Sequence, residues 1–190
     1  MGIAKGQDEL AEDLLSNLPT NIDLLIPNIC FVEALTTLEQ ENKFDDRFIH
    51  SLNIQVNEAE RNKNSGNAKL VVSHLKQAKI SFLKKQNDTR LRFHRTFNLL
   101  IERAEIIEFN TEILLECSKE GILENHILDK IILNCIIYHA KLHPHTPKVF
   151  LSSNSKEFGS SDVSAILRDV GILYFSKTQN FLGWLQSQNP

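Results

Sequence analysis

The sequence predicts an α/β fold, in which a parallel sheet carries helices on both faces. Short apolar runs alternate with longer helical patterns, and this alternation is typical of parallel strands joined by right-handed crossovers. The chain has 190 residues, of which 42% are hydrophobic, with seven glycines and five prolines. This length and composition suit one packed core. We therefore expect a single domain over 1–190.

The N-terminal elements are predicted to be a helix, a strand and a second helix. Asp8 is placed to cap a short helix that Pro19 ends. The brief apolar run 23–26 predicts a strand. A proline and an asparagine then separate this strand from a helix expected over 29–40.

Residues 44–103 form a long helical region that we interpret as an insertion. Apolar side chains recur at helical spacing on both sides of a polar break at 62–67. Asn87 and Asp88 predict the turn of a helical hairpin. In the second part of the region, arginines alternate with an apolar stripe.

Strand and helix alternate again in the second half of the chain. Asn110 is placed to cap a helix that Gly121 ends. The predicted strands cover 105–109, 148–153 and 172–175, and the remaining predicted helices cover 124–142, 162–170 and a closing segment around 181–185.

The net charge of −3 hides a strongly basic segment within the predicted insertion. From Arg61 to Arg103 the chain has eleven bases and two acids, and the rest of the chain is acidic. Such a segment is either a solvated helical face with long cationic stems or a surface that binds phosphates. The candidate nucleic-acid-binding residues are Lys76, Lys79, Lys84, Lys85, Arg92 and Arg95.

No apolar run approaches the roughly 20 residues that span a bilayer. The first 22 residues contain four acids where a signal peptide needs an apolar core. The three cysteines are far apart in the sequence and odd in number, which favours reduced thiols over a disulfide framework. We therefore expect a cytoplasmic protein without a membrane contact.

Four polar residues follow predicted strands or begin predicted helices, where α/β proteins place their sites. Glu33 and Asp129 lie early in largely apolar helices, and Asn154 and Glu157 come directly after the strand at 148–153. Hard oxygen ligands of this kind suit Mg²⁺ or Mn²⁺, which can activate water for attack on a phosphodiester. A single acid near a helix start can instead stabilise the helix dipole.

Three segments resemble the motifs of PIN-domain nucleases. Residues 26–35 are similar to the strand, proline and acidic helix of that family, and 128–133 to its second acidic helix. Residues 149–158 resemble its last catalytic strand, where a hydroxyl residue, an Asn or Asp, and an acid followed by Phe recur. The resemblance extends from about residue 22 to 186, with the basic helical region as an enlargement.

The resemblance implies a three-layer α/β/α PIN-like fold and a metal-dependent endoribonuclease that uses Mg²⁺ or Mn²⁺. It implies Glu33, Asp129 and Asn154 as metal ligands, with Glu157 completing the site. The implied partners are RNA and an antitoxin protein, because many relatives are toxins of type II toxin–antitoxin pairs.

One family feature is absent, namely a first apolar strand that ends in aspartate. Residues 1–7 offer few apolar candidates for it. A sheet without this strand would leave apolar faces and unpaired backbone groups, which favours a homodimer. The alternative function is a non-catalytic nucleic-acid or protein-binding module that works through the basic hairpin.

A zinc site is a competing hypothesis. Cys135, His139 and His143 recur every four residues on one helical stripe, and His145 follows. Histidines at the end of a helix also complement its negative dipole, so the pattern has a structural interpretation as well.

Overall fold

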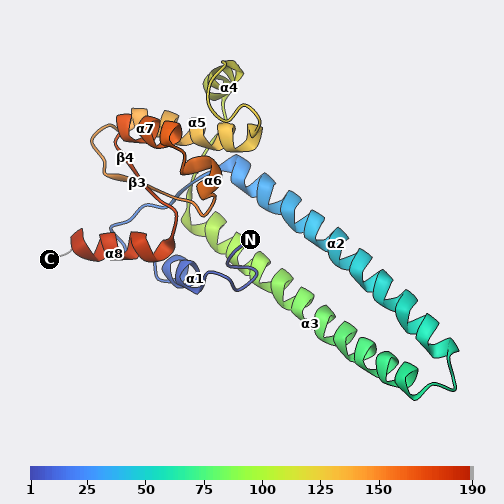
Figure 1. Ribbon diagram of the computed structural model, residues 1–190. Helices are drawn as coiled ribbons and strands as arrows, with labels where there is room; N and C mark the ends of the chain where they lie inside the picture. Colours follow the sequence, from blue (N-terminus) through green and yellow to red (C-terminus); the bar gives the residue numbers. More distant parts are fainter. Residues whose placement is uncertain (189–190) are drawn as a thin grey trace. The chain divides into compact units, whose positions relative to one another are not determined.

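The computed structural model describes residues 1–188 and is 68% helical (Figure 1). Its strands are β1 (Leu25–Pro27), β2 (Glu105–Ile107), β3 (Lys148–Leu151) and β4 (Ile172–Phe175). Its helices are α1 (Glu9–Ser16), α2 (Asn28–Arg61), α3 (Gly66–Arg103), α4 (Thr111–Ser118), α5 (Ile127–Leu142), α6 (Ser155–Phe158), α7 (Ser161–Asp169) and α8 (Thr178–Gln188). None of the helices within 1–188 is long and apolar enough to cross a membrane.

The prediction of a three-layer α/β/α PIN-like fold is wrong. β1 pairs only with β2 and β3 only with β4, and no strand among residues 1–188 joins the two pairs into one sheet. Both pairings are parallel. The physical reason is the shortness of the strands, which have three or four residues and so form few ladder hydrogen bonds each. The chain is mostly helical, with little sheet.

The chain divides into two compact units. One unit comprises residues 1–7 and 34–98, and the other comprises 8–33 and 99–190. We call them the hairpin unit and the strand unit. All four strands lie in the strand unit, and most of the region predicted as a helical insertion lies in the hairpin unit.

Helix α5 organises the core of the strand unit. One cluster of buried residues joins its Leu133 to Phe158 of α6, Val163 of α7 and Ile172 of β4. A second cluster joins its fully buried Cys135 to residues of β2 and α4. Because α5 supplies side chains to both clusters, it fixes the two strand pairs around its own axis.

Side-chain caps fix two of the shorter helices as predicted. Oδ1 of Asp8 accepts a hydrogen bond from the Ala11 N–H at the start of α1, and Oδ1 of Asn110 accepts one from the Ile113 N–H at the start of α4. The second carboxylate oxygen of Asp8 accepts a hydrogen bond from the Thr178 hydroxyl at 2.8 Å. Asp8 therefore also links α1 to the first residue of α8.

The hairpin unit contains most of α2 and α3, which run antiparallel side by side (Figure 1). The turn between them lies at 62–65, within the predicted polar break. The turn predicted at Asn87 and Asp88 is wrong, because both residues lie inside the continuous helix α3. Neither residue breaks a helix that packs along its whole length against a second helix.

The contact between α2 and α3 has the spacing of a coiled coil. Leu38, Leu52 and Val56 of α2 are buried. In α3 the buried and half-buried side chains recur at alternating steps of three and four residues, which keeps one stripe against the partner helix. This stripe consists of Ala68, Val72, Leu75, Lys79, Phe82, Gln86, Thr89 and Phe93.

Candidate active site

Asp129 and Asn154 meet in the strand unit. Asp129 lies in the first turn of α5, and Asn154 lies between β3 and the short helix α6. The side-chain amide of Asn154 donates a hydrogen bond from Nδ2 to Oδ1 of Asp129 at 3.1 Å. Two residues that lie 25 positions apart in the sequence are therefore in direct contact, as their place after strands and at helix starts predicted.

Glu33 and Glu157 lie within electrostatic reach of this pair. Burial raises the pKa of Glu33 above its ordinary value, and the nearby carboxylate of Asp129 raises it further. Burial also raises the pKa of Asp129, and the Glu157 carboxylate adds to this rise. The Asn154 hydrogen bond opposes the rise at Asp129 because it stabilises the charged form. All four residues predicted from the sequence thus lie in one region.

Glu157 is held in place by its neighbours. Its side chain is 10% exposed, and its Oε1 lies 3.5 Å from Nζ of Lys156 and 3.7 Å from Nε2 of His126. A methyl group at Gly159 would collide with the carbonyl oxygen of Ser155, so the chain needs glycine where α6 closes. His126 and Lys156 therefore hold the Glu157 carboxylate, and the close approach at Gly159 restricts the backbone that follows it.

His126 is a site residue that the sequence did not single out. It occupies the position just before α5, whereas the predicted helix begins at 124 and places it inside the helix. The signal in the sequence that could have identified it was a histidine immediately before an otherwise apolar helix. At 3.7 Å, its Nε2 can form an ion pair with Glu157 when the imidazole is protonated.

Cys30 borders the acidic residues but does not add a reactive thiol. Burial raises its pKa to about 12, and the carboxylate of Glu33 contributes to the rise, as do Cys135 and Asp129. A thiol with such a pKa stays protonated near neutral pH and is a poor nucleophile or metal ligand. The oxygen-bearing side chains therefore carry whatever chemistry this region performs.

The oxygen atoms of this region form at most a partial set of ligands for a cation. Among residues 1–188, no group of three or more His, Cys, Asp or Glu side chains could hold a metal ion. Asp129, Glu33 and the amide oxygen of Asn154 supply two carboxylates and one neutral oxygen. Mg²⁺ commonly binds through one or two carboxylates while water and substrate phosphates complete its shell.

The structure favours the structural interpretation of the competing zinc motif. Cys135 is fully buried, and burial raises its pKa to about 11. The rings of His139 and His143 stack with their centroids 4.3 Å apart, and Nδ1 of His143 lies 3.0 Å from the His139 carbonyl oxygen. The two imidazoles thus interact with each other and with the backbone at the end of α5, which is a structural role.

Most of the bases proposed to bind nucleic acid make contacts within the hairpin unit. Lys84 and Arg95 are exposed on α3, and the other four contact neighbouring groups. Nζ of Lys76 lies 2.7 Å from Oε1 of Glu60, and Nζ of Lys79 donates a hydrogen bond to Oδ1 of Asn53 at 2.8 Å. Nζ of Lys85 lies 5.7 Å from the centre of the Phe82 ring, and Nε of Arg92 donates a hydrogen bond to the carbonyl oxygen of Ala4 at 2.9 Å. These four side chains have partners within the hairpin unit itself.

The raised pKa of Asp129 predicts a pH-dependent stability difference between the wild type and Asp129→Asn. A raised native pKa means that the folded state holds the proton more tightly than the unfolded state, so this carboxyl costs stability as pH rises above its ordinary value of 3.8. We expect Asp129→Asn to be more stable than the wild type at neutral pH and equally stable below that value. Urea unfolding curves of both proteins across this pH interval measure the difference, and a difference independent of pH would contradict the raised pKa of Asp129.

Comparisons of the sequence and the structure with known proteins found no matching family model, no matching curated protein and no matching solved structure.

Proposed function

We propose that this chain is a metal-dependent endoribonuclease whose site is built around Asp129. The observation that carries the proposal is the 3.1 Å hydrogen bond between Asn154 and Asp129 beside the carboxylates of Glu33 and Glu157. Gathering three carboxylates in a partly buried region costs stability through mutual repulsion and desolvation. Groups held in that way are typical of sites that bind a cation.

The cation in this proposal is Mg²⁺ or Mn²⁺, held by Asp129 and Glu33 with the amide oxygen of Asn154. When bound, such a cation activates water and neutralises developing charge on a phosphodiester. Asn154 orients the Asp129 carboxylate through its own N–H donor. Glu157, held by His126 and Lys156, adds negative charge beside Asp129 and so strengthens the attraction for a cation.

RNA as the substrate is supported by the motifs that resemble PIN-domain nucleases and by the excess of bases on α3. Lys84 and Arg95 are exposed and able to contact phosphates. The same resemblance supports an antitoxin protein as a partner.

A second candidate function is a non-catalytic module that binds nucleic acid or protein. It is favoured by the described residues 1–188, in which no group of three or more His, Cys, Asp or Glu side chains could hold a metal ion. In this alternative the acidic residues hold the start of α5 against α6, and the hairpin unit carries the interaction.

Incubation of the full chain with a single-stranded RNA and Mn²⁺ tests the choice between the two functions. A nuclease is expected to cleave the RNA internally, and EDTA is expected to stop the cleavage. Metal binding has an independent readout. At about ten times the dissociation constant, Mn²⁺ should raise the free energy of unfolding by about 1.4 kcal/mol. No cleavage together with no stabilisation would leave the non-catalytic module.

A further inference from the structure

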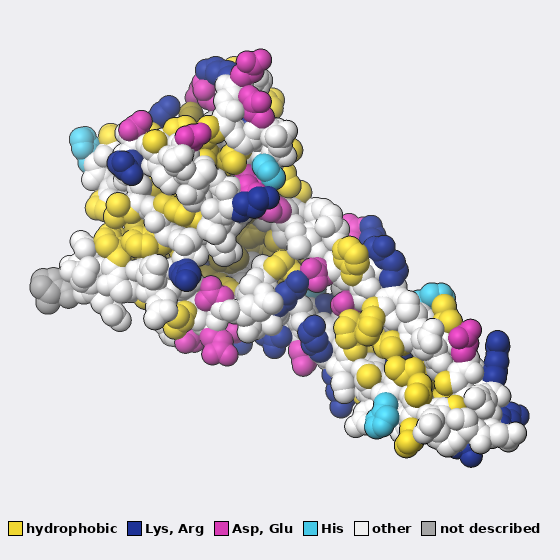
Figure 2. Space-filling view, in the orientation of Figure 1, with side chains coloured by type: hydrophobic (Ala, Val, Ile, Leu, Met, Phe, Trp, Pro, Cys, Tyr) yellow, Lys and Arg dark blue, Asp and Glu magenta, His cyan; other side chains and the backbone are white. Residues whose placement is uncertain are grey.

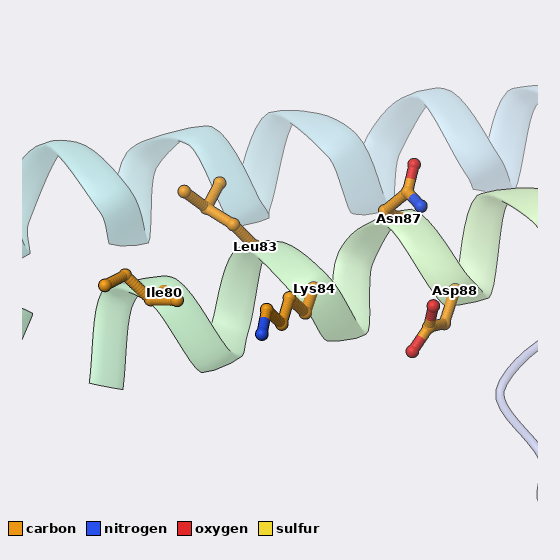
Figure 3. Close-up of a pocket in the computed structure, with 5 residues that line it drawn as sticks. All are labelled: Ile80, Leu83, Lys84, Asn87 and Asp88. Atoms are coloured by element: carbon orange, nitrogen blue, oxygen red, sulfur yellow. The ribbon is translucent and has the colours of Figure 1, made fainter. Parts of the chain in front are cut away.

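A shallow, open hollow lies on the surface of α3 in the hairpin unit. Ile80, Leu83, Lys84, Asn87 and Asp88 line it, and Figure 3 shows Leu83 and Asn87 on the side of the helix nearest α2. The first four of these residues stand at positions i, i+3, i+4 and i+7. Four residues with that spacing form the hole that receives a side chain from a facing helix in a coiled coil. The hollow therefore has the residue spacing that a side chain of a further helix could fill.

This surface is apolar as well as hollow. Ile80 and Leu83 are 56% and 42% exposed, and Ile54 of α2 is 44% exposed. Lys79 donates a hydrogen bond to Asn53, so the antiparallel register puts their sequence neighbours Ile80 and Ile54 at a similar height along the hairpin. Figure 2 shows hydrophobic side chains gathered over the hairpin on the face in view.

The stripe along which α2 and α3 touch, here called the seam, gives the hairpin unit few apolar core residues. Lys79, Gln86 and Thr89 occupy seam positions where a coiled coil normally has apolar side chains. Two long helices with such a seam bury little apolar area between them, and further helices packed on an outer face would add to it.

The charges of the two helices identify the occupant. Within the hairpin unit, α2 carries six acids against three bases, whereas α3 carries eight bases against one acid. An acidic helix is thus the complement of α3, and the chain itself contains one in α2. A twofold axis parallel to the helices places α2 of a second copy on α3 and, at the same time, α3 of that copy on α2.

We propose that the hairpin unit pairs with the hairpin unit of a second copy of this chain to form a four-helix bundle. In this bundle every neighbouring pair of helices is antiparallel, and the hollow at Ile80, Leu83, Lys84 and Asn87 receives a side chain of the partner's acidic helix. A twofold axis perpendicular to the helices is excluded by charge, because it would place the basic helix on its own copy. The pairing does not rest on the proposed nuclease function, but it covers Lys84 and leaves Arg95 as the exposed base for RNA.

Sedimentation velocity of the full chain over a wide range of concentration tests the pairing. The wild type is expected to be a dimer, and Leu83→Glu is expected to raise the dimer dissociation constant by about a hundredfold or more, because each copy then buries an unpaired carboxylate. Leu115→Glu, an equivalent change at an exposed leucine of α4 in the strand unit, should leave the constant unchanged. Far-UV circular dichroism verifies that both variants keep the helical content of the wild type.

The direction of pairing has its own test. Asn64→Cys adds a thiol at the turn between α2 and α3, and mild oxidation should link two such chains rapidly, because the proposed axis brings the two turns together. Wild type treated in the same way is the control for the native cysteines. A monomeric wild type, an undisturbed dimer in Leu83→Glu or unlinked turns would each overturn the proposal. A monomer whose affinity for RNA falls in Lys84→Gln would assign this face to RNA.

Discussion

Asp129→Asn is expected to lower manganese-dependent RNA cleavage by about a hundredfold or more, because the proposed function makes Asp129 a metal ligand, and losing such a ligand forfeits several kcal/mol of transition-state stabilisation. Asparagine keeps the size of the side chain and an oxygen that can accept the hydrogen bond from Asn154. The variant therefore removes a charge while it leaves the local packing in place. Cleavage rates under single-turnover conditions measure the loss.

The matched control is Asp169→Asn, the same chemical change at an exposed residue of α7. It should cleave RNA at the wild-type rate. The expected combination for Asp129→Asn is unusual, because the variant should be more stable than the wild type at neutral pH and yet inactive. If Asp129→Asn cleaved RNA at the wild-type rate, Asp129 would not belong to the proposed site. Its raised pKa would then have no role in catalysis.

The local elements of the fold could largely be predicted from the sequence, but the sheet could not. Helix caps depend on one side chain and its nearest backbone, so Asp8 and Asn110 were identified correctly. Pairing between strands depends on partners that are distant in the sequence. The apolar runs at 23–26 and 148–153 were recognisable as strands, but their patterns do not state which edges pair, and the expected single sheet is two separate ladders.

The hairpin shows a second limit of local patterns. Asn87 and Asp88 have turn propensity, and the coiled-coil stripe through Phe82, Gln86 and Thr89 overrides it. The same stripe explains why the sequence alone did not show which basic residues are free to bind phosphates and which contact the facing helix. Lys76 lies beside the seam and pairs with Glu60 of the facing helix, which only the antiparallel register of the two helices reveals.

The residues of the candidate site were predictable because each follows a strand or begins a helix, and such positions gather where parallel strands end. His126 was missed because the predicted start of α5 was three residues too early. Helix boundaries are local decisions between similar backbone conformations, so an error of this size is ordinary. In this chain the error placed His126 inside the predicted helix, so its imidazole was not recognised as a neighbour of Glu157.

Phe158→Ala is expected to lower the free energy of unfolding of the strand unit by about 3–5 kcal/mol. Phe158 is the last residue of α6 and is 2% exposed, and its ring meets that of Phe150 edge to face with centroids 4.9 Å apart. Alanine would leave a cavity among side chains from α5, α7 and β4. A loss of this size is a large part of the roughly 5–15 kcal/mol that stabilises an ordinary domain.

The effect of Phe158→Ala should reach the candidate site, because Phe158 anchors the helix that carries Glu157. Urea unfolding followed by tryptophan fluorescence of Trp184 measures the stability of the strand unit, and Leu173→Ala, at a leucine that is 49% exposed, is the control with a small expected loss. Phe158→Leu should recover much of the stability, since it refills most of the cavity. If alanine at 158 costs no more than alanine at 173, then α6 is not anchored by its phenylalanine. Glu157 would then be positioned by its contacts with His126 and Lys156 alone.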